Sequence, residues 1–445
     1  MKSVNIKEAA LTADNNSELG FATSPPRTSR ATSLMERWAR SFVFGVLAQL
    51  KNGRVILEEN GERQVFGDPH TEAAAATLTA HIHVLSPAFY TDLLRGGSIG
   101  CGESYMQQHW ASNDLITLVR VIVLNMHVLD GVDGQRSWFK RLATRVLHRL
   151  NANSREGSRR NISAHYDLSN EFFASFLDPT MMYSAAIFPT DALSLHEASL
   201  NKLTHICERL QLTAEDHLLE IGTGWGSMAL HAAQQYGCRV TTTTLSRQQY
   251  DFAERRIREA GLQDRVTLLL KDYRDLEGQY DKLVSVEMIE AVGHQYYASY
   301  FSKCSSLLKP EGLMLIQAIT ISDQRYEQAK HTVDFIQRYI FPGGCLPSNS
   351  VIARHVCEDT DMQIIGLEDI TRDYAVTLER WRDAFLAESP QILAHGFTPE
   401  FMRMWDYYLA YCQGGFMERV IHTAQLLIAK PMFRETPRIG LPATR

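Results

Sequence analysis

The most constraining feature of the chain is a glycine-rich turn at residues 219–227, which read Leu-Glu-Ile-Gly-Thr-Gly-Trp-Gly-Ser. A short apolar strand ending at Ile221 leads into the turn, and a helical run beginning at Met228 follows it. Glycine tolerates positive φ and has no Cβ, so the backbone can come close to a ligand at a helix N-terminus. The turn therefore predicts a nucleotide-type ligand beyond the end of a buried strand.

The spacing of the glycines separates two classes of ligand. A dinucleotide-binding turn has the pattern G-x-G-x-x-G, with an acidic residue about 20 positions further on. Here the glycines alternate (Gly222, Gly224 and Gly226), and the second strand ends at Thr244 without a carboxylate. Glu220, directly before the turn, suits a ligand with a cationic amino group or sugar hydroxyls. These residues favour S-adenosylmethionine (SAM) over a dinucleotide.

Apolar strands and helical segments alternate between residues 215 and 320. Strands are expected at 217–221, 238–244, 265–270, 281–287 and 312–319, and helices at 226–236, 246–260 and 294–308. This rhythm predicts a doubly wound, mostly parallel α/β sheet, whose ligands bind beyond the carboxyl ends of the strands. The residues at those ends are 222–226, 244–249, 272–273, 287–290 and 317–319. Residues 321–440 are expected to be largely helical.

The first 160 residues divide into three regions. Residues 1–32 are polar and expected to be disordered, and 33–135 are expected to form a small α+β domain. Its expected elements are a helix at Leu34–Lys51, a hairpin around Asn60-Gly61, a glycine-rich bend at 96–102 and a helix carrying Trp110 and 115–123. Residues 136–160 form a basic linker, partly amphipathic, which fits either a solvated inter-domain helix or docking on anionic lipid headgroups. The remaining domain is expected at 161–440.

Length and composition limit the classes of protein to which the chain can belong. A chain of 445 residues can bury a large core, and its net charge of −6 argues against nucleic-acid binding. The seven cysteines include no C-x-x-C pair, so neither a disulfide framework nor a zinc site is indicated, and a cytoplasmic location is expected. The longest apolar runs, Phe42–Leu50 and Leu115–Met126, are too short or too interrupted to span a bilayer. Any contact with a membrane is therefore expected to be peripheral.

Several motifs accompany the glycine turn in order along the chain. They are His165–Phe173, Leu177–Ser184, Glu220–Gly226, Thr244–Gln249, Lys271–Asp275 and Tyr339–Pro347. Over about residues 160–430 they make the chain resemble the cyclopropane-fatty-acyl-phospholipid synthase family. The N-terminal region resembles that family's smaller lipid-handling domain, chiefly at Gly102–Met106. The resemblance implies a class I SAM methyltransferase with a Rossmann-like fold.

The same resemblance implies a reaction on a cis double bond of unsaturated phospholipid acyl chains, at the inner face of the membrane. The alkene attacks the sulfonium methyl group, a carbocation forms on the chain, and loss of a proton from the new methyl group closes a cyclopropane ring. Proton loss from the chain instead gives a methyl-branched or methylene product. Another methylated fatty acid or a small amine as substrate, and a lipid-binding scaffold without catalysis, are the alternatives. A homodimer is left open.

The resemblance assigns residues around the cofactor. Those expected to bind SAM are Tyr183, Ser184, Glu220, Gly222, Gly224, Trp225, Gly226, Thr244, Ser246, Gln249, Asp272 and Tyr273. His165 and Asp167 are expected to fasten a helix over the cofactor. Aromatic faces suit a carbocation because they attract it without offering a nucleophile. The candidates for that role are Tyr183, Trp225, Tyr339 and Tyr374.

The proton acceptor in this family is a bound bicarbonate, held by Glu, Tyr, Cys and His side chains with a backbone amide. Glu290 and Tyr374 match two of these holders, whereas Ala185 and Gln317 stand where the family has cysteine and histidine. Gln317 can still hydrogen-bond an anion, and the alanine side chain cannot. Cys412 matches a cysteine considered catalytic, but a thiol needs a lowered pKa to react and no sequence neighbour supplies one. We therefore expect Cys412 to be structural.

Overall fold

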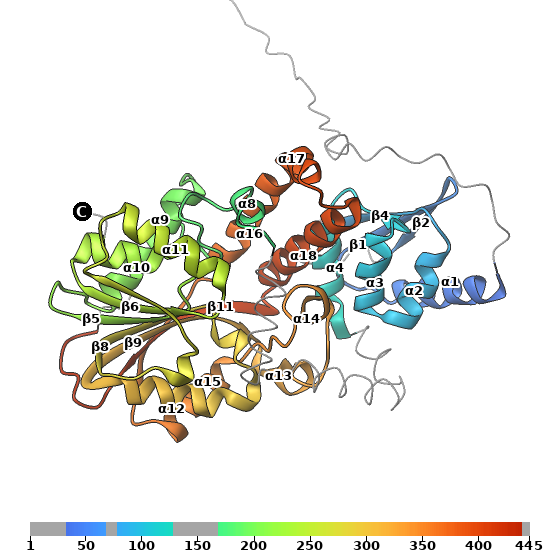
Figure 1. Cartoon of the computed structure of the whole chain (residues 1–445). Helices are drawn as coiled ribbons and strands as arrows, with labels where there is room; N and C mark the ends of the chain where they lie inside the picture. Colours follow the sequence, from blue (N-terminus) through green and yellow to red (C-terminus); the bar gives the residue numbers. More distant parts are fainter. Residues whose placement is uncertain (1–32, 68–77, 128–167, 438–445) are drawn as a thin grey trace, which may run out of the picture.

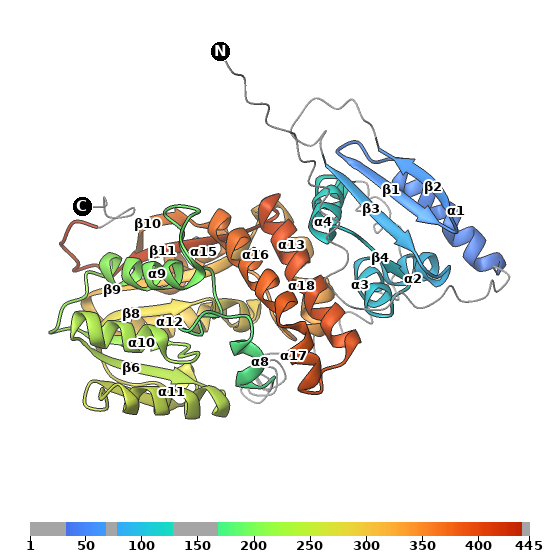
Figure 2. The ribbon, with the colours of Figure 1, turned by 90° about the horizontal axis from the view of Figure 1, so that it is seen from above.

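The computed structural model describes residues 33–67, 78–127 and 168–437. They form a small N-terminal α+β unit and a larger α/β unit, which lie side by side in both views (Figures 1 and 2). Four sequence-based expectations fall outside the described residues: the tail at 1–32, the basic linker at 136–160, His165 and Asp167.

A seven-stranded sheet in the order β10-β11-β9-β8-β5-β6-β7 forms the larger unit. Its strands are β5 (His217–Ile221), β6 (Arg239–Thr244), β7 (Val266–Leu270), β8 (Tyr280–Val286), β9 (Leu308–Ile321), β10 (Gln363–Asp369) and β11 (Ile421–Ala429). Strands β7, β6, β5, β8 and β9 pair in parallel, and β11 runs antiparallel to both β9 and β10. The predicted doubly wound, mostly parallel sheet is confirmed, with β9 longer at both ends than expected.

Helices cover both faces of this sheet (Figure 1). One face carries α9 (Leu195–Arg209), α10 (Ser227–His231), a π-helical turn at 232–236 and α11 (Arg247–Glu259), and the other carries α12 (Tyr297–Leu307) and α15 (Asn349–Asp359). Further helices are α8 (Asn170–Ala174), α13 (Asp323–Ala329), α14 (Phe335–Tyr339), α16 (Thr371–Ala387), α17 (Ser389–Ala394) and α18 (Pro399–Met417), and 3₁₀ turns lie at 273–275, 289–291 and 294–296. Helices α16 and α18 stand between the sheet and the N-terminal unit (Figure 2).

The expectation that 321–440 is largely helical is wrong for β10 and β11. From Thr423 to Ala429, β11 is buried at every position, so this short run shows no alternation of buried and exposed residues. Such a run does not distinguish a strand from a buried helix. Pairing with β9, which places Gln425 opposite Gln317, decides the outcome, and that contact is not visible in the local pattern.

Within residues 33–67 and 78–127, the N-terminal unit has a four-stranded sheet in the order β2-β1-β3-β4 and four helices. Its elements are α1 (Leu34–Leu47), β1 (Arg54–Glu59), β2 (Glu62–Phe66), β3 (Thr79–Val84), α2 (Ala88–Gly96), α3 (Ser98–Met106), β4 (Trp110–Ala111) and α4 (Leu115–Leu124). The predicted hairpin at Asn60-Gly61 is confirmed. Trp110 lies on β4 rather than on the predicted helix.

The predicted glycine-rich bend at 96–102 is largely a helix. Gly97, with φ of 59°, separates α2 from α3, whereas Gly100 and Gly102 lie within α3. A Cβ at Gly100 would lie 2.2 Å from the Asp92 carbonyl oxygen, and one at Gly102 would lie 2.4 Å from the Phe335 ring. These glycines therefore allow close packing rather than a bend.

Helix α3 fastens the N-terminal unit to the larger one. The Tyr105 hydroxyl donates to Asp406 on α18 at 2.8 Å, and Arg382 on α16 donates to the same buried carboxylate at 2.7 Å. The Tyr339 hydroxyl, at the end of α14, donates to Glu103 at 2.5 Å. Among the described residues, no helix has both the length and the apolar character needed to cross a bilayer.

Candidate active site

The glycine turn lies at the C-terminal end of β5, as predicted. Gly222, Gly224 and Gly226 all have positive φ, at 104°, 52° and 92°. A Cβ at Gly226 would lie 3.1 Å from the Cβ of Ala253 on α11, whereas one at Gly224 would meet no atom within 4 Å. Gly226 thus permits the start of α10 to pack closely against α11, and Gly224 leaves the backbone open toward a ligand.

Glu220 is a buried carboxylate beside this turn. It accepts a hydrogen bond from the Thr242 hydroxyl at 2.6 Å, and burial raises its pKa to about 8. Lys202 on α9 is also buried, its ammonium donates to the Ser184 hydroxyl at 2.6 Å, and burial lowers its pKa to about 8. The predicted residues Ser184 and Glu220 therefore share the electrostatic field of one buried lysine.

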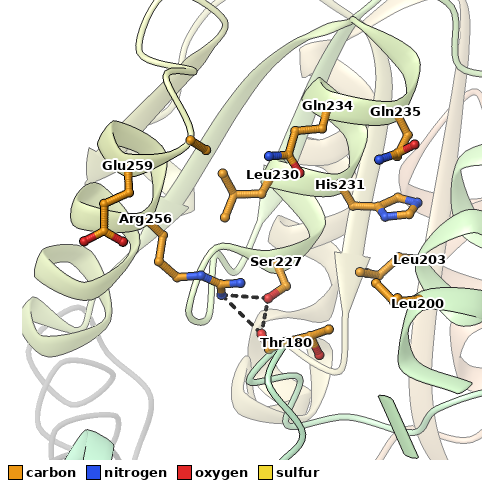
Figure 3. A pocket seen from close by; sticks show the side chains of 11 residues that line it. Thr180, Leu200, Leu203, Ser227, Leu230, His231, Gln234, Gln235, Arg256 and Glu259 are labelled. Atoms are coloured by element: carbon orange, nitrogen blue, oxygen red, sulfur yellow. Dashed lines mark hydrogen bonds between the residues drawn. The ribbon is translucent and has the colours of Figure 1, made fainter. Parts of the chain in front are cut away.

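Arg256 on α11 joins the turn to the segment before the sheet. Its guanidinium donates to the carbonyl oxygens of Trp225 and Thr180 at 2.9 and 3.2 Å and to the Ser227 hydroxyl at 2.9 Å. Arg256, Ser227 and Thr180 are among the residues that line a pocket of about 410 Å³ between α9, α10 and α11 (Figure 3). None of the predicted SAM-binding residues lines this pocket, so it is separate from the predicted site.

The remaining predicted cofactor residues lie at the ends of β6 and β7, beside the turn. Thr244 donates to Gln249 at 2.8 Å and accepts from the Ser246 amide at 3.1 Å, so the start of α11 is held against β6. Asp272 follows β7 and accepts two bonds from Arg274, at 2.8 and 2.7 Å. Tyr273 comes next, and burial raises its pKa to about 12. Because β5, β6 and β7 are neighbours, these groups share one edge of the sheet.

Glu287 is the centre of a second cluster, and it was not among the predicted site residues. It directly follows β8 and has a φ of 50°. Its Oε1 accepts from the Ala185 amide at 2.9 Å and from Gln317 Nε2 at 2.8 Å, and its Oε2 accepts from the Tyr374 hydroxyl at 2.7 Å. Three positions expected to surround a bicarbonate thus meet at one side-chain carboxylate. In the sequence, Glu287 and Glu290 both lie at the expected end of β8. This position did not show which of the two carboxylates would be the centre of the cluster.

The predicted Glu290 is held differently. One of its oxygens accepts from the Ile319 amide, and its Oε2 is buried without a hydrogen-bond partner among the described residues. Burial and repulsion from Glu287 raise the pKa of Glu290 to about 8. At neutral pH the protonated form of Glu290 is therefore favoured.

An aromatic wall adjoins the Glu287 carboxylate. The Tyr374 ring stacks on Phe416 at 4.5 Å and meets Trp381 edge-on at 6.1 Å. Tyr183 lies 5.1 Å from Trp381, and its hydroxyl is 2.8 Å from that of Tyr408. The structure therefore brings together two of the four aromatic candidates, Tyr183 and Tyr374.

Of the other two aromatic candidates, Trp225 borders this wall and Tyr339 contacts the N-terminal unit. Trp225 packs against Phe173 with ring centroids 5.0 Å apart, and Phe173 lies 5.3 Å from Tyr183. The Trp225 indole also donates to Asn170 on α8 at 2.7 Å. The Tyr339 hydroxyl is bonded to Glu103 of the N-terminal unit instead.

Cys412 on α18 lies near Tyr374 and Tyr408. Burial raises the pKa of its thiol well above the usual value, and the negative charge of Asp334 raises it further. A nucleophilic thiol needs the opposite shift. The environment of Cys412 is that of a structural cysteine.

The family model described as "Mycolic acid cyclopropane synthetase" matches residues 153–426. The chain is 38% identical to the tuberculostearic acid methyltransferase UfaA1 of Mycobacterium tuberculosis, over 80% of this chain and 84% of that protein. It is 37% identical to the cyclopropane-fatty-acyl-phospholipid synthase of Escherichia coli, over 80% of this chain and 90% of that protein.

A solved structure agrees with these sequence relatives. The mycolic acid cyclopropane synthase CmaA1, complexed with S-adenosylhomocysteine (SAH) and CTAB, superposes with a TM-score of 0.58 at 29% identity. The match covers 61% of this chain and 98% of that chain. The larger unit therefore has the fold of an enzyme that is solved with the demethylated form of SAM.

Proposed function

The chain belongs to the mycolic acid cyclopropane synthetase family and is a SAM-dependent methyltransferase of class I fold, and on this premise we propose that it methylates unsaturated phospholipid acyl chains at the double bond. The observation that carries the proposal is the contact between the Glu287 carboxylate and an aromatic wall at the carboxyl ends of the strands. An alkene that takes a methyl cation needs both features. The wall stabilises positive charge, and the carboxylate can remove a proton.

The residues of the glycine turn fit SAM. When bound, SAM supplies an electrophilic methyl group on a sulfonium centre. Gly224 leaves open space above the backbone, and Glu220 provides a buried acceptor for a cationic amino group. Because burial raises the pKa of Glu220 to about 8, a bound cation would stabilise its ionised form and gain affinity in return.

The aromatic wall suits a carbocation on the acyl chain. Rings of Tyr183, Trp381 and Tyr374 present π-faces or edges within one cluster, and a cation over such a face is stabilised by about 0.5–2 kcal/mol per ring. The hydroxyls of Tyr183 and Tyr374 are engaged with Tyr408 and Glu287, so their oxygens are held in place rather than presented as nucleophiles.

A lipid substrate is supported by the relatives and by the N-terminal unit. The Tyr339 motif reaches the wall through Phe341, whose ring centroid lies 6.4 Å from that of Tyr183, and the Tyr339 hydroxyl donates to Glu103 of that unit. On α1 of the same unit, Leu34, Met35 and Trp38 are 79%, 47% and 61% exposed, next to the exposed Arg37. Apolar and basic side chains on one amphipathic helix suit the surface of an anionic bilayer. We place the enzyme in the cytoplasm, peripheral to the inner face of the membrane.

Two products are consistent with methyl transfer to the double bond. A cyclopropane is the product named for the Escherichia coli relative, and the Mycobacterium tuberculosis relative is named a tuberculostearic acid methyltransferase. Ala185 and Gln317 stand at positions where the family has cysteine and histidine. These two differences support a methyl-branched or methylene chain as the second candidate product.

Product analysis tests the proposal. The full chain is incubated with SAM and vesicles of unsaturated phospholipid, with saturated phospholipid as the control, and the fatty acids are analysed by mass spectrometry. We expect a gain of one methylene on unsaturated chains alone. Hydrogenation before analysis separates a ring from an alkene. Absence of the gain on every lipid, or methylation of a soluble amine instead, would overturn the lipid assignment.

A further inference from the structure

The residues around Glu287 do not fit the bicarbonate that the family resemblance implies. Of the side chains expected to hold that anion, Tyr374 and Gln317 lie at Glu287, and the backbone amide of Ala185 lies beside them. All three donate to the Glu287 carboxylate, at 2.7, 2.8 and 2.9 Å. A carboxylate and a bicarbonate present the same planar pair of oxygens, so both require the same donors. The place of the anion is filled by a side chain of the protein.

We infer that Glu287 is the proton acceptor of this methyltransferase and replaces the external anion. The identity of the proton donor, a methylated acyl chain, rests on the function proposed above. The replacement of the anion rests on the hydrogen bonds of Glu287 alone.

The surrounding charges favour Glu287 over Glu290 as the base. Three donors stabilise the ionised form of Glu287, and the ammonium of Lys202 on α9 adds a favourable charge. Burial outweighs these contributions and raises the pKa of Glu287, which makes it a stronger base than an exposed carboxylate. Glu290, with one amide donor and a pKa of about 8, is mostly protonated at neutral pH. Of the two carboxylates, Glu287 therefore has the larger number of groups that stabilise the ionised form.

The backbone at Glu287 is consistent with a specialised role. A non-glycine residue at φ 50° is uncommon and costs energy, and such residues concentrate at functional sites. The Glu287 amide donates to the Gln317 carbonyl at 2.7 Å, which helps to hold this conformation. Gln317 is held in turn by Gln425 on β11, which donates to its Oε1 at 2.9 Å. Glycine would adopt the same backbone without strain, so a glutamate at this position adds its carboxylate at a cost in backbone energy.

The chemical step balances without another reactant. Once the methyl group has joined one alkene carbon, the other carbon is cationic. A Glu287 oxygen bonds to a proton of a neighbouring C–H group, and the C–H electron pair neutralises the cation. If the proton leaves the new methyl group, the pair closes a cyclopropane; if it leaves the chain, the pair forms a double bond. Glu287 is left as a carboxylic acid and returns its proton to solvent.

Binding of bicarbonate tests the replacement directly and does not need activity. The ¹³C resonance of labelled bicarbonate is followed in the presence of the full native chain and of Glu287→Gly. We expect no line broadening with the native chain and clear broadening with Glu287→Gly, because the variant frees three donors. Bicarbonate binding by the native chain at this site, abolished by Tyr374→Phe, would overturn the inference.

Activity tests the role as base. We expect Glu287→Gln to lower kcat by about 100-fold or more while SAH still binds, because general-base catalysis contributes about 10²–10⁴-fold. Activity of Glu287→Gly should be restored in part by bicarbonate, to which the native enzyme should not respond. The matched control is Glu208→Gln, which removes a half-buried carboxylate that also accepts from a tyrosine hydroxyl, that of Tyr236 at 2.9 Å.

The outcomes separate the two proposals. Native activity that rises with bicarbonate, or full activity of Glu287→Gln, would refute the role of Glu287. Failure of the native chain to methylate any lipid would refute the proposed function, and the bicarbonate-binding comparison would still decide whether Glu287 occupies the anion's place.

Discussion

Replacement of Tyr374 with phenylalanine should move the acid limb of the pH–rate profile upward by about 1–2 pH units. The Tyr374 hydroxyl is one of three donors to Glu287, at 2.7 Å. A hydrogen bond to a charged group contributes about 1.5–3 kcal/mol, and one pKa unit corresponds to about 1.4 kcal/mol. Loss of the hydroxyl should raise the pKa of Glu287 by that amount, while the phenylalanine ring keeps the stacking on Phe416.

The sign follows from the role of the carboxylate. Glu287 accepts a proton only when ionised, so kcat falls as the pH drops below its pKa, which burial already holds above the usual value. In Tyr374→Phe the fall should begin at higher pH, and kcat should recover toward the native value when the pH is raised. A misfolded variant would not recover.

The assay is the initial rate of methylene incorporation into unsaturated vesicles between about pH 5.5 and 9, with a thermal melt at each pH. Tyr408→Phe is the matched control, because its hydroxyl contacts that of Tyr183 rather than a carboxylate. Its acid limb should stay in place. A uniform loss of rate at every pH in Tyr374→Phe, or an unshifted limb, would refute the assignment of Glu287 as a base.

Three further predictions concern other parts of the molecule. Gly226→Ala should lower the free energy of unfolding by about 1–2 kcal/mol or more in denaturant titrations, because position 226 has a positive φ and the new Cβ would lie 3.1 Å from Ala253. Gly224→Ala adds a Cβ that meets no atom within 4 Å, so it should destabilise the protein less and chiefly weaken SAH binding in calorimetry. Trp38→Ala should weaken sedimentation with anionic vesicles by roughly fivefold, about 1 kcal/mol of lost apolar burial, and unchanged binding would argue against α1 as the membrane contact. Cys412→Ser should keep kcat within about threefold of native, because the raised pKa of the thiol excludes a thiolate nucleophile; a loss of about 100-fold in a folded protein would contradict this.

The sequence was sufficient where structure follows from local pattern. Strands β5 to β8 and the turn at Gly222–Gly226 were predicted to within a residue, because buried parallel strands are short apolar runs separated by helices. Strand β11 was missed because it is buried on both faces, so its sequence does not show the alternation that marks a half-exposed strand. Gly102 was read as part of a bend, although its role is to admit the Phe335 ring, a residue distant in sequence.

Within the candidate site, the sequence identified the residues at the ends of β5 and β6, and it named Tyr374 and Gln317 but not Glu287, the carboxylate to which they donate. Glu220 and Thr244 lie at predicted strand ends, so their neighbourhood follows from the order of the strands. The role of Glu287 depends on an uncommon φ and on donors from three other parts of the chain. Neither property has a signature in a single sequence.

The bond between Gln425 and Gln317 has a consequence for assembly of the site during synthesis. The glycine turn and the strand ends beside it lie between residues 217 and 275 and come together through neighbouring strands. Gln425 holds Gln317, which in turn donates to Glu287, the proton acceptor. Gln425 arrives with β11, after every other strand of the sheet. A nascent chain that has completed β5 to β9 can therefore form the nucleotide-binding edge before its base is held in position. Competence for proton removal is acquired when the antiparallel strand inserts, so ligand binding and chemistry are separated in the order of folding.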